Sequence, residues 1–477
     1  MRAGMDTVQL RDAGTVATAY RSTGLIEFLH DLTYDQLPQD VRAKARQCLL
    51  DALGCGLFGT LQPWSCILTA EMIEERSAGN CTVIGHDARL SAPAAAMCNG
   101  LAIHGYELDD LIASSIIHPA AAVVPAALAA AEASGASGEA VILGIVAGYE
   151  IMHRVAVAMG VAPSRLGFHV TSLTAPVAAA MAAGKVTGLD LGQLTSAIGV
   201  SCSAASGIKA FASGDGGGMV KRLHLGRGAE AGVRACQLVR RGFSGPPYAI
   251  DGRFGLLEIF GGATAAPERL TDGLGSKWAI SDIWFKVYPI CGWIQPVVQV
   301  LSDMRGDRTF AAKDVASVKV GVSSYAAANN GNPAPVDTMG AQYSIPFCAA
   351  LALLGDPKDP AEYGGDRLSE PAMREIQSKV EIYVSPEAEA VYPAKFAADV
   401  ELTLADGSVR RMFVPECRGT PADPCSDAEL EQKFLILARK VLGQDDARAL
   451  AGKVSQVDGL ESLADLTRLL GAAPKAS

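Results

Sequence analysis

Residues that could transfer protons lie close together in one short stretch of the sequence. His104 is followed by Glu107, Asp109 and Asp110, and His118 comes soon afterwards. Carboxylates at this spacing repel one another, and burial would raise the pKa of at least one of them toward neutrality. A carboxyl group of that kind is suited to general acid or base catalysis. Two other interpretations are open: the acids could solvate a loop, or the group could bind a metal, although its spacing matches no known metal cage.

A further histidine directly precedes an expected helix. His169 follows Arg165-Leu-Gly-Phe and comes before Val170-Thr-Ser, where the helix is expected to open. The unpaired backbone N–H groups and the positive dipole end at a helix start disfavour a protonated imidazole. His169 could therefore act as a base, and an ordinary loop histidine is the other interpretation.

A glycine run leads into a group of cationic side chains. The run Ser213–Gly218 is followed by Lys221, Arg222, His224 and Arg227. A phosphate loop needs glycine before its lysine and Ser or Thr after it, and this segment has neither, nor does it fit the dinucleotide fingerprint. The sequence instead predicts a local positive pocket, which an anionic substrate would need in an acidic protein.

One lysine lies among aromatic residues. Lys286 belongs to the segment Asp282–Pro289, together with Trp284, Phe285 and Tyr288. Aromatic packing would remove water from the ammonium group, and a buried lysine has either a lowered pKa or an anionic partner. We consider the substrate a candidate for that partner.

The composition of the chain argues against several classes of protein function and location. The chain has 477 residues and a formal net charge of -10, which argues against binding nucleic acid because that depends on Lys and Arg neutralising phosphates. Its 11 cysteines include no C-x-x-C pair, and the first residues lack the order of a secretory signal, so a cytoplasmic protein is predicted. The apolar stretch from Ile116 to Ala133 is interrupted by His118, Pro119 and Pro125, and no membrane span is predicted.

Apolar spacing predicts a helical first half. The length favours two domains, and abundant small residues with few aromatic ones favour closely packed helices. Residues up to about 20 lack a consistent apolar period and are expected to form a loose arm. Helices are predicted over residues 38–58, 92–106, 119–133, 138–159, 171–183, 191–205 and 228–241.

The apolar period changes beyond Ser281. Alternating apolar residues predict strands around Val320 and Ile382, and Asp406-Gly407 predicts a hairpin turn. A capping box that begins at Ser426 marks the return to helix. The predicted fold is therefore mainly α, with a large all-helical domain built from the N- and C-terminal segments and a smaller α+β lid domain. The expected limits are 1–280, 281–414 and 415–477.

Several motifs, taken in order, resemble one family. They are Glu107-Leu-Asp-Asp110 with His118-Pro119, Phe168-His169, Lys221-Arg-Leu-His224-Leu-Gly226, Phe285-Lys286 and Ala341-Gln-Tyr-Ser-Ile-Pro-Phe347. This pattern resembles the MmgE/PrpD family over nearly the whole chain. Its known activities include 2-methylcitrate dehydratase, cis-aconitate decarboxylase and iminodisuccinate epimerase. The resemblance implies a homodimer that needs no metal or organic cofactor.

The resemblance also implies an active site in the cleft between the two domains. The positions that match its catalytic residues are His118, His169, Lys221, Lys286 and Tyr325. The chain departs from the family where Glu107 replaces Asp and Leu111 replaces Thr, so substrate contacts at this edge are expected to differ. The predicted substrate-binding residues are Glu107, Asp109, Asp110, Arg222 and His224.

The predicted substrate is a small anionic polycarboxylate. Removing a proton beside a carboxylate creates extra negative charge, which Lys221, Lys286 and Arg222 would offset while His118 and His169 move protons. Dehydration ranks first among the outcomes, followed by epimerisation and decarboxylation. A non-catalytic protein that binds the same ligands is the alternative from another class.

Overall fold

The computed structural model describes residues 20–212, 218–306 and 310–471. The chain is mainly helical, as predicted, with few strands. The predicted N-terminal arm and most of the glycine run, residues 213–217, lie outside the described residues.

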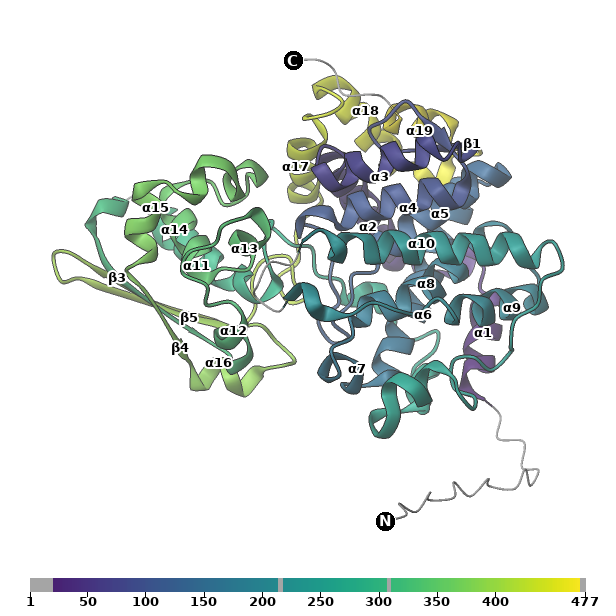
Figure 1. Ribbon diagram of the computed structural model, residues 1–477, viewed down its shortest axis with the longest axis horizontal. Helices are drawn as coiled ribbons and strands as arrows, with labels where there is room; N and C mark the ends of the chain where they lie inside the picture. Colours follow the sequence, from purple (N-terminus) through teal and green to yellow (C-terminus); the bar gives the residue numbers. More distant parts are fainter. Residues whose placement is uncertain (1–19, 213–217, 307–309, 472–477) are drawn as a thin grey trace, which may run out of the picture.

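The first half of the chain folds into packed helices, which Figure 1 shows on the right in purple to teal. They are α1 (Arg21–Asp31), α2 (Gln39–Gly59), α3 (Pro63–Glu74), α4 (Ala92–Ile103), α5 (Ala120–Ser134), α6 (Gly138–Met159), α7 (Ala162–Arg165), α8 (Val170–Val186), α9 (Leu191–Cys202) and α10 (Val220–Val239). This part is not entirely helical, because β1 (Ala78–Thr82) and β2 (Arg89–Leu90) form a small antiparallel sheet. The sequence did not reveal β1, since its residues show no apolar alternation; Glu132 of α5 accepts hydrogen bonds from Thr82.

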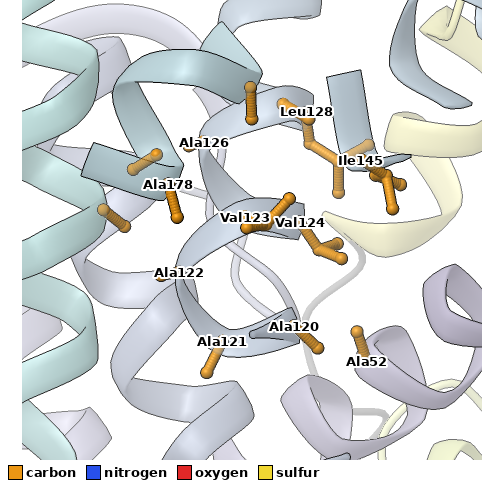
Figure 2. Packing of buried hydrophobic residues seen from close by; sticks show 14 of the residues in the cluster. Ala52, Ala120, Ala121, Ala122, Val123, Val124, Ala126, Leu128, Ile145 and Ala178 are labelled. Carbon is orange, nitrogen blue, oxygen red and sulfur yellow. The ribbon is translucent and has the colours of Figure 1, made fainter. Parts of the chain in front are cut away.

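Small residues let these helices pack closely. Figure 2 shows alanines and valines of α5, among them Val123 and Val124, enclosed by Ile145 of α6 and Ala178 of α8. A Cβ atom added to Gly100 of α4 would lie 2.6 Å from the carbonyl oxygen of Ala121. Only glycine permits this approach, so the abundance of small residues is explained by helix contacts.

Glycines also explain why the predicted start of helix α10 was wrong. The sequence predicted a helix from residue 228, but α10 begins at Val220 and continues through Gly226, Gly228 and Gly232. Glycine lowers helix propensity, which is why the earlier turns were missed. A Cβ on Gly226 would lie 2.4 Å from the carbonyl oxygen of Met97, so these glycines serve contacts with neighbouring helices.

Helix α6 is long and apolar enough to cross a membrane, judged by length and composition. However, 78% of its most apolar window is buried inside the protein, and α6 packs against α8. A core helix passes the same test, so α6 is weak evidence for a membrane span.

The second part of the chain contains a four-stranded sheet, drawn in green in Figure 1. Its order is β4 (Val380–Val384), β3 (Val315–Val322), β5 (Ala398–Leu404) and β6 (Val409–Val414). β3 and β4 are parallel, with Val320 beside Ile382, and the other pairs are antiparallel. The predicted strands and the hairpin at Asp406-Gly407 are confirmed, and Gly407 has the positive φ of 86° that its turn requires.

Short helices surround this sheet. They are α11 (Gln295–Gly306), α12 (Ser324–Asn329), α13 (Thr338–Gln342), α14 (Ile345–Leu354), α15 (Pro371–Gln377) and α16 (Pro386–Val391). Buried residues from Tyr288 to Leu404 form a core of their own here.

The last helices return to the first core. They are α17 (Asp427–Ala438), α18 (Gln444–Ser455) and α19 (Ala464–Leu470), and α17 packs against α2. The predicted capping box is present, because Ser426 accepts from the N–H of Glu429, whose carboxylate accepts from Ser426 in return. One core thus joins both ends of the chain, while the exact limits at 280 and 414 stay predictions.

Candidate active site

A cavity of about 270 Å³ lies between the two parts of the molecule. Its first wall comes from the helical part and includes His118, His169 and Lys221. Its second wall comes from residues 293–392 and includes Tyr325 and Tyr343. Four of the five predicted catalytic residues therefore line one cavity; the fifth, Lys286, is considered below.

His118 is held by the loop that follows the acidic segment. Its Nδ1 donates to the backbone carbonyl of Asp110 at 2.7 Å and lies 3.6 Å from Oδ2 of Asp109. Burial lowers the pKa of His118 to about 3, although Asp109 acts in the opposite direction. The imidazole is therefore neutral near pH 7, and with Nδ1 as donor its Nε2 can accept a proton.

His169 precedes α8, as predicted, and occupies its N-cap position. Nδ1 of His169 lies 3.1 Å from Nδ1 of His224, and the His169 ring contacts Phe211 with the ring centroids 5.4 Å apart. Burial, followed by the nearby His104 and Lys221, lowers the pKa of His169 well below its usual range. The cavity thus presents a second neutral imidazole.

Glu107 lies between two lysines. It has a left-handed backbone, with φ of 57°, and its carboxylate accepts from Lys221 through Oε1 and from Lys286 through Oε2 at 3.1 Å. Lys221 also donates to the hydroxyl of Tyr343 at 2.9 Å. All three charged groups are buried. The expected anionic partner of Lys286 is therefore Glu107, not the substrate that the sequence suggested.

The charges of Glu107, Lys221 and Lys286 stabilise one another against the cost of burial. Burial raises the pKa of Glu107, but Lys221 and Lys286 outweigh it and lower that pKa well below its usual range. Burial likewise disfavours the charged form of Lys286, yet Glu107 and Asp109 raise its pKa. Two ammonium groups facing one carboxylate leave one positive charge for a bound anion.

The other two acids contact protein groups. Nδ1 of His104 donates to Oδ2 of Asp109 at 2.6 Å, and both side chains are fully buried. Asp110 accepts from the hydroxyl of Tyr149 at 2.6 Å and from a backbone N–H. Burial raises the pKa of Asp110 to about 8, as the sequence predicted for one of these carboxylates.

Three residues lie close enough together to hold a metal ion, which their spacing in the sequence did not reveal. Ligand atoms of His104, Asp109 and His118 lie within 4.8 Å of one another. His104 donates through Nδ1 to Oδ2 of Asp109, and His118 donates to the carbonyl of Asp110, whereas Nε2 of His104 and Oδ1 of Asp109 have no hydrogen-bond partner among the described residues. The three residues therefore form a hydrogen-bonded chain.

Among the described residues, the cavity lining leaves out all five predicted substrate-binding residues. They are Glu107, Asp109, Asp110, Arg222 and His224. The guanidinium of Arg222 donates to the carbonyl of Gly218 at 2.9 Å and lies over the ring of Trp64. These side chains contact the lining residues or the backbone instead, so direct contact of the five with substrate is unsupported.

Lys286 lines a different cavity, of about 300 Å³, beside α17. Its ammonium group reaches the first cavity only through Glu107, which also accepts from Lys221. Lys286 therefore contacts the residues of the first cavity through that carboxylate.

Several polar lining residues were missed by the sequence analysis, among them Lys209, Asn330 and Tyr343. Lys209 faces the cavity and donates to Ser164 at 3.4 Å, and buried Asn330 donates to the carbonyl of Tyr343. Lys209 stands alone in sequence and gave no signal. Tyr343 lies within a quoted motif, and Asn330 lies in an Asn-Asn-Gly-Asn run that reads as a turn.

This cavity brings two neutral imidazoles and an ammonium group to one site, as an enzyme that transfers protons on a small molecule would require. Two family models match the chain: the MmgE/PrpD N-terminal domain over residues 23–268 and the MmgE/PrpD C-terminal domain over residues 288–458. The chain belongs to the MmgE/PrpD family, as the resemblance predicted.

Curated relatives match almost end to end. Cis-aconitate decarboxylase of Aspergillus terreus is 27% identical over 92% of this chain and 94% of its own length. Cis-aconitate decarboxylase-like protein oryM of Aspergillus oryzae is 28% identical, with 94% and 95% covered. Human cis-aconitate decarboxylase is 27% identical, with 93% and 92% covered. The chain is thus an enzyme in a family of lyases.

Proposed function

We propose that this protein is a lyase that makes or breaks a bond beside a carboxylate on a small polycarboxylic acid. The observation that carries the proposal is the convergence of His118, His169 and Lys221 on one cavity. Two neutral imidazoles can exchange protons with carbon or oxygen, and an ammonium group beside them stabilises the negative charge that develops.

Each side chain has a defined part in this chemistry. A substrate carboxylate binds the ammonium group of Lys221, which Lys286 supports from behind through Glu107. His118 or His169 takes or returns the proton at the carbon beside that carboxylate. Tyr325 lines the opposite wall and contacts the substrate's far end or a hydroxyl. Movement of the second domain as a lid would exclude water.

Decarboxylation of cis-aconitate is the first reaction to test, because the curated relatives carry that name. In that reaction a carbon–carbon bond breaks, carbon dioxide leaves, and the remaining carbanion takes a proton. The substrate's carboxylates would raise the pKa of a nearby imidazole, which could then donate that proton.

Dehydration is the second candidate, because it begins with a neutral base. The pKa of His118 is lowered to about 3 and that of His169 is lowered well below its usual range, so both imidazoles are neutral in the ligand-free protein. A base is what abstraction of a proton beside a carboxylate requires, with loss of hydroxide from the next carbon. Epimerisation would use the same abstraction, followed by return of the proton to the other face.

Proton NMR in heavy water separates these outcomes. The enzyme is incubated with cis-aconitate, citrate, 2-methylcitrate and iminodisuccinate in turn. Release of carbon dioxide with a deuterium-labelled product shows decarboxylation, an alkene shows dehydration, and exchange without net product shows epimerisation. No reaction and no exchange with any of these acids would contradict the proposal and favour the non-catalytic binding protein.

The proposal includes a cytoplasmic homodimer that needs no cofactor. All eleven cysteines are unpaired thiols, and most are buried, which suits a reducing compartment. Light scattering would measure the oligomeric state. Activity that survives dialysis against a chelator would support independence from metal, and loss restored by one metal ion would contradict it.

A further inference from the structure

The cavity has apolar surface that the proposed chemistry does not use. Besides the imidazoles and Lys221, its lining includes Ile116 and Phe211 on the helical side and Val336 and Trp293 on the other. A compact polycarboxylate would be expected to require mainly cationic and hydrogen-bonding groups. The apolar part of the lining therefore points to a second feature of the ligand.

Two of these side chains are exposed and do not belong to a hydrophobic core. Val336 is 88% exposed and Ile116 is 38% exposed. Ile116 also has a positive φ of 52°, a strained conformation that is an outlier for a β-branched residue. Glycine would fit this position in the loop without strain. An isoleucine held there at a cavity is explained by an apolar contact that forms when a ligand binds.

The opposite wall contains a row of aromatic rings. The ring of Tyr325 lies between those of Trp293 and Tyr392, with centroid separations of 4.9 and 5.9 Å. Trp293 packs in turn on Phe396, which shares a small core with Leu111. This support holds the row in place, and the row presents more apolar surface than one methyl group could cover.

We propose that the substrate carries an alkyl substituent longer than a methyl group, which lies between Ile116 and Val336 at the mouth and the row Trp293–Tyr325–Tyr392. The carboxylate of the same molecule binds Lys221, so the inference rests on the proposed function and names its substrate class: alkyl-substituted polycarboxylic acids. The helical wall binds the charged end, and both walls bind the apolar tail.

Binding of a homologous series tests this substituent site without requiring turnover. The dissociation constants of succinates with no substituent or with a methyl, propyl or butyl group are measured by calorimetry on the full chain. Affinity is expected to rise about fourfold for each added methylene, because burial of a methylene contributes about 0.8 kcal/mol. Equal affinity for the methyl and butyl compounds would overturn the inference, as would failure of every succinate to bind.

Two variants locate the site. Ile116→Gly relieves the backbone strain and removes the side chain, and Val336→Asn changes an exposed residue that the fold does not need. Both should lower the ratio of butyl to unsubstituted affinity by about fourfold or more. Ile67→Asn, at a 62% exposed position on α3, is the matched control and should leave the ratio unchanged. An unchanged ratio in both cavity variants would overturn the placement.

This test is separate from that of the proposed function. A butyl preference without turnover of any acid would retain the substituent site and contradict the lyase. Turnover of cis-aconitate without a butyl preference would retain the lyase and contradict the substituent site.

Discussion

The two walls of the cavity carry different kinds of side chain. The helical wall brings the imidazoles and ammonium groups, His118, His169, Lys209 and Lys221, whereas the wall from residues 293–392 brings most of the aromatic rings, the amides and one carboxylate, that of Asp337. The helical residues are fixed by hydrogen bonds within a large core. The proposed proton-transfer groups therefore belong to the larger core, and we expect the second part of the chain to decide which ligands can enter.

The largest effect is expected at the helical wall. Lys221→Ala removes the ammonium group that faces the substrate and should lower kcat/KM by about 10²–10³, since one lost electrostatic donor costs about 3–4 kcal/mol. Steady-state kinetics measure this loss, and circular dichroism checks the fold. Lys185→Ala is the control, because Lys185 donates only to carbonyls of α1 and its C-cap, away from the cavity. More than a tenth of normal activity in Lys221→Ala would refute this role.

The carboxylate behind that wall should matter most for stability. Glu107→Gln removes the carboxylate that forms ion pairs with both buried Lys221 and Lys286, and leaves only the more distant Asp109 to act on Lys286. Breaking a buried ion pair by removing one partner costs about 3–5 kcal/mol, so the free energy of unfolding should fall by about that amount. Urea denaturation measures the change. A loss below about 1 kcal/mol would show that water reaches these lysines.

The histidines should give a smaller loss and a distinctive pH profile. His118→Gln is expected to lower kcat by about a hundredfold, the size of a lost general base. Because the pKa of His118 is about 3, the wild type should keep its base neutral from pH 7 down to pH 5. A fall in kcat/KM centred near pH 6.5 would instead indicate a solvated histidine, and that result would weaken the contrast between the walls.

Substitutions on the aromatic wall should act mainly on binding. Tyr325→Phe keeps the ring and removes one hydroxyl, so kcat/KM should fall by only about two- to tenfold, the value of one hydrogen bond. The change is expected in KM more than in kcat. A hundredfold fall in kcat would make Tyr325 a proton donor and would break the division of tasks between the walls.

Asp110→Asn, which lies behind the helical wall, is expected to change the pH dependence of stability. The folded-state pKa of Asp110 is raised to about 8, so its stabilising contribution is complete below pH 4 and is lost as pH rises through 8. Asparagine removes this titration, so the free energy of unfolding of the variant should fall less than that of the wild type as the pH rises from 4 to 8. Denaturation curves over that range should then show a flatter decline than in the wild type.

The sequence predicted the helices and strands better than it predicted the contacts between their side chains. Apolar periods located most helices and the β3–β6 sheet, because burial of one face imposes the period directly. The order of motifs located His118, His169 and Lys221. Sequence order carries no record of packing, however, and so it did not show that Glu107 would contact both lysines or that isolated Lys209 would reach the cavity.

The joining of both chain ends in one core bears on how the protein is made. Helices α17 to α19 pack beside the first helices, and Figure 1 shows them together, away from the sheet of the second part. A ribosome must therefore finish almost the entire chain before the larger core is complete, whereas the segment from Tyr288 to Leu404 already holds the residues of its own core. The inserted segment can mature first, and the earlier helices must be protected from aggregation until the last ones emerge.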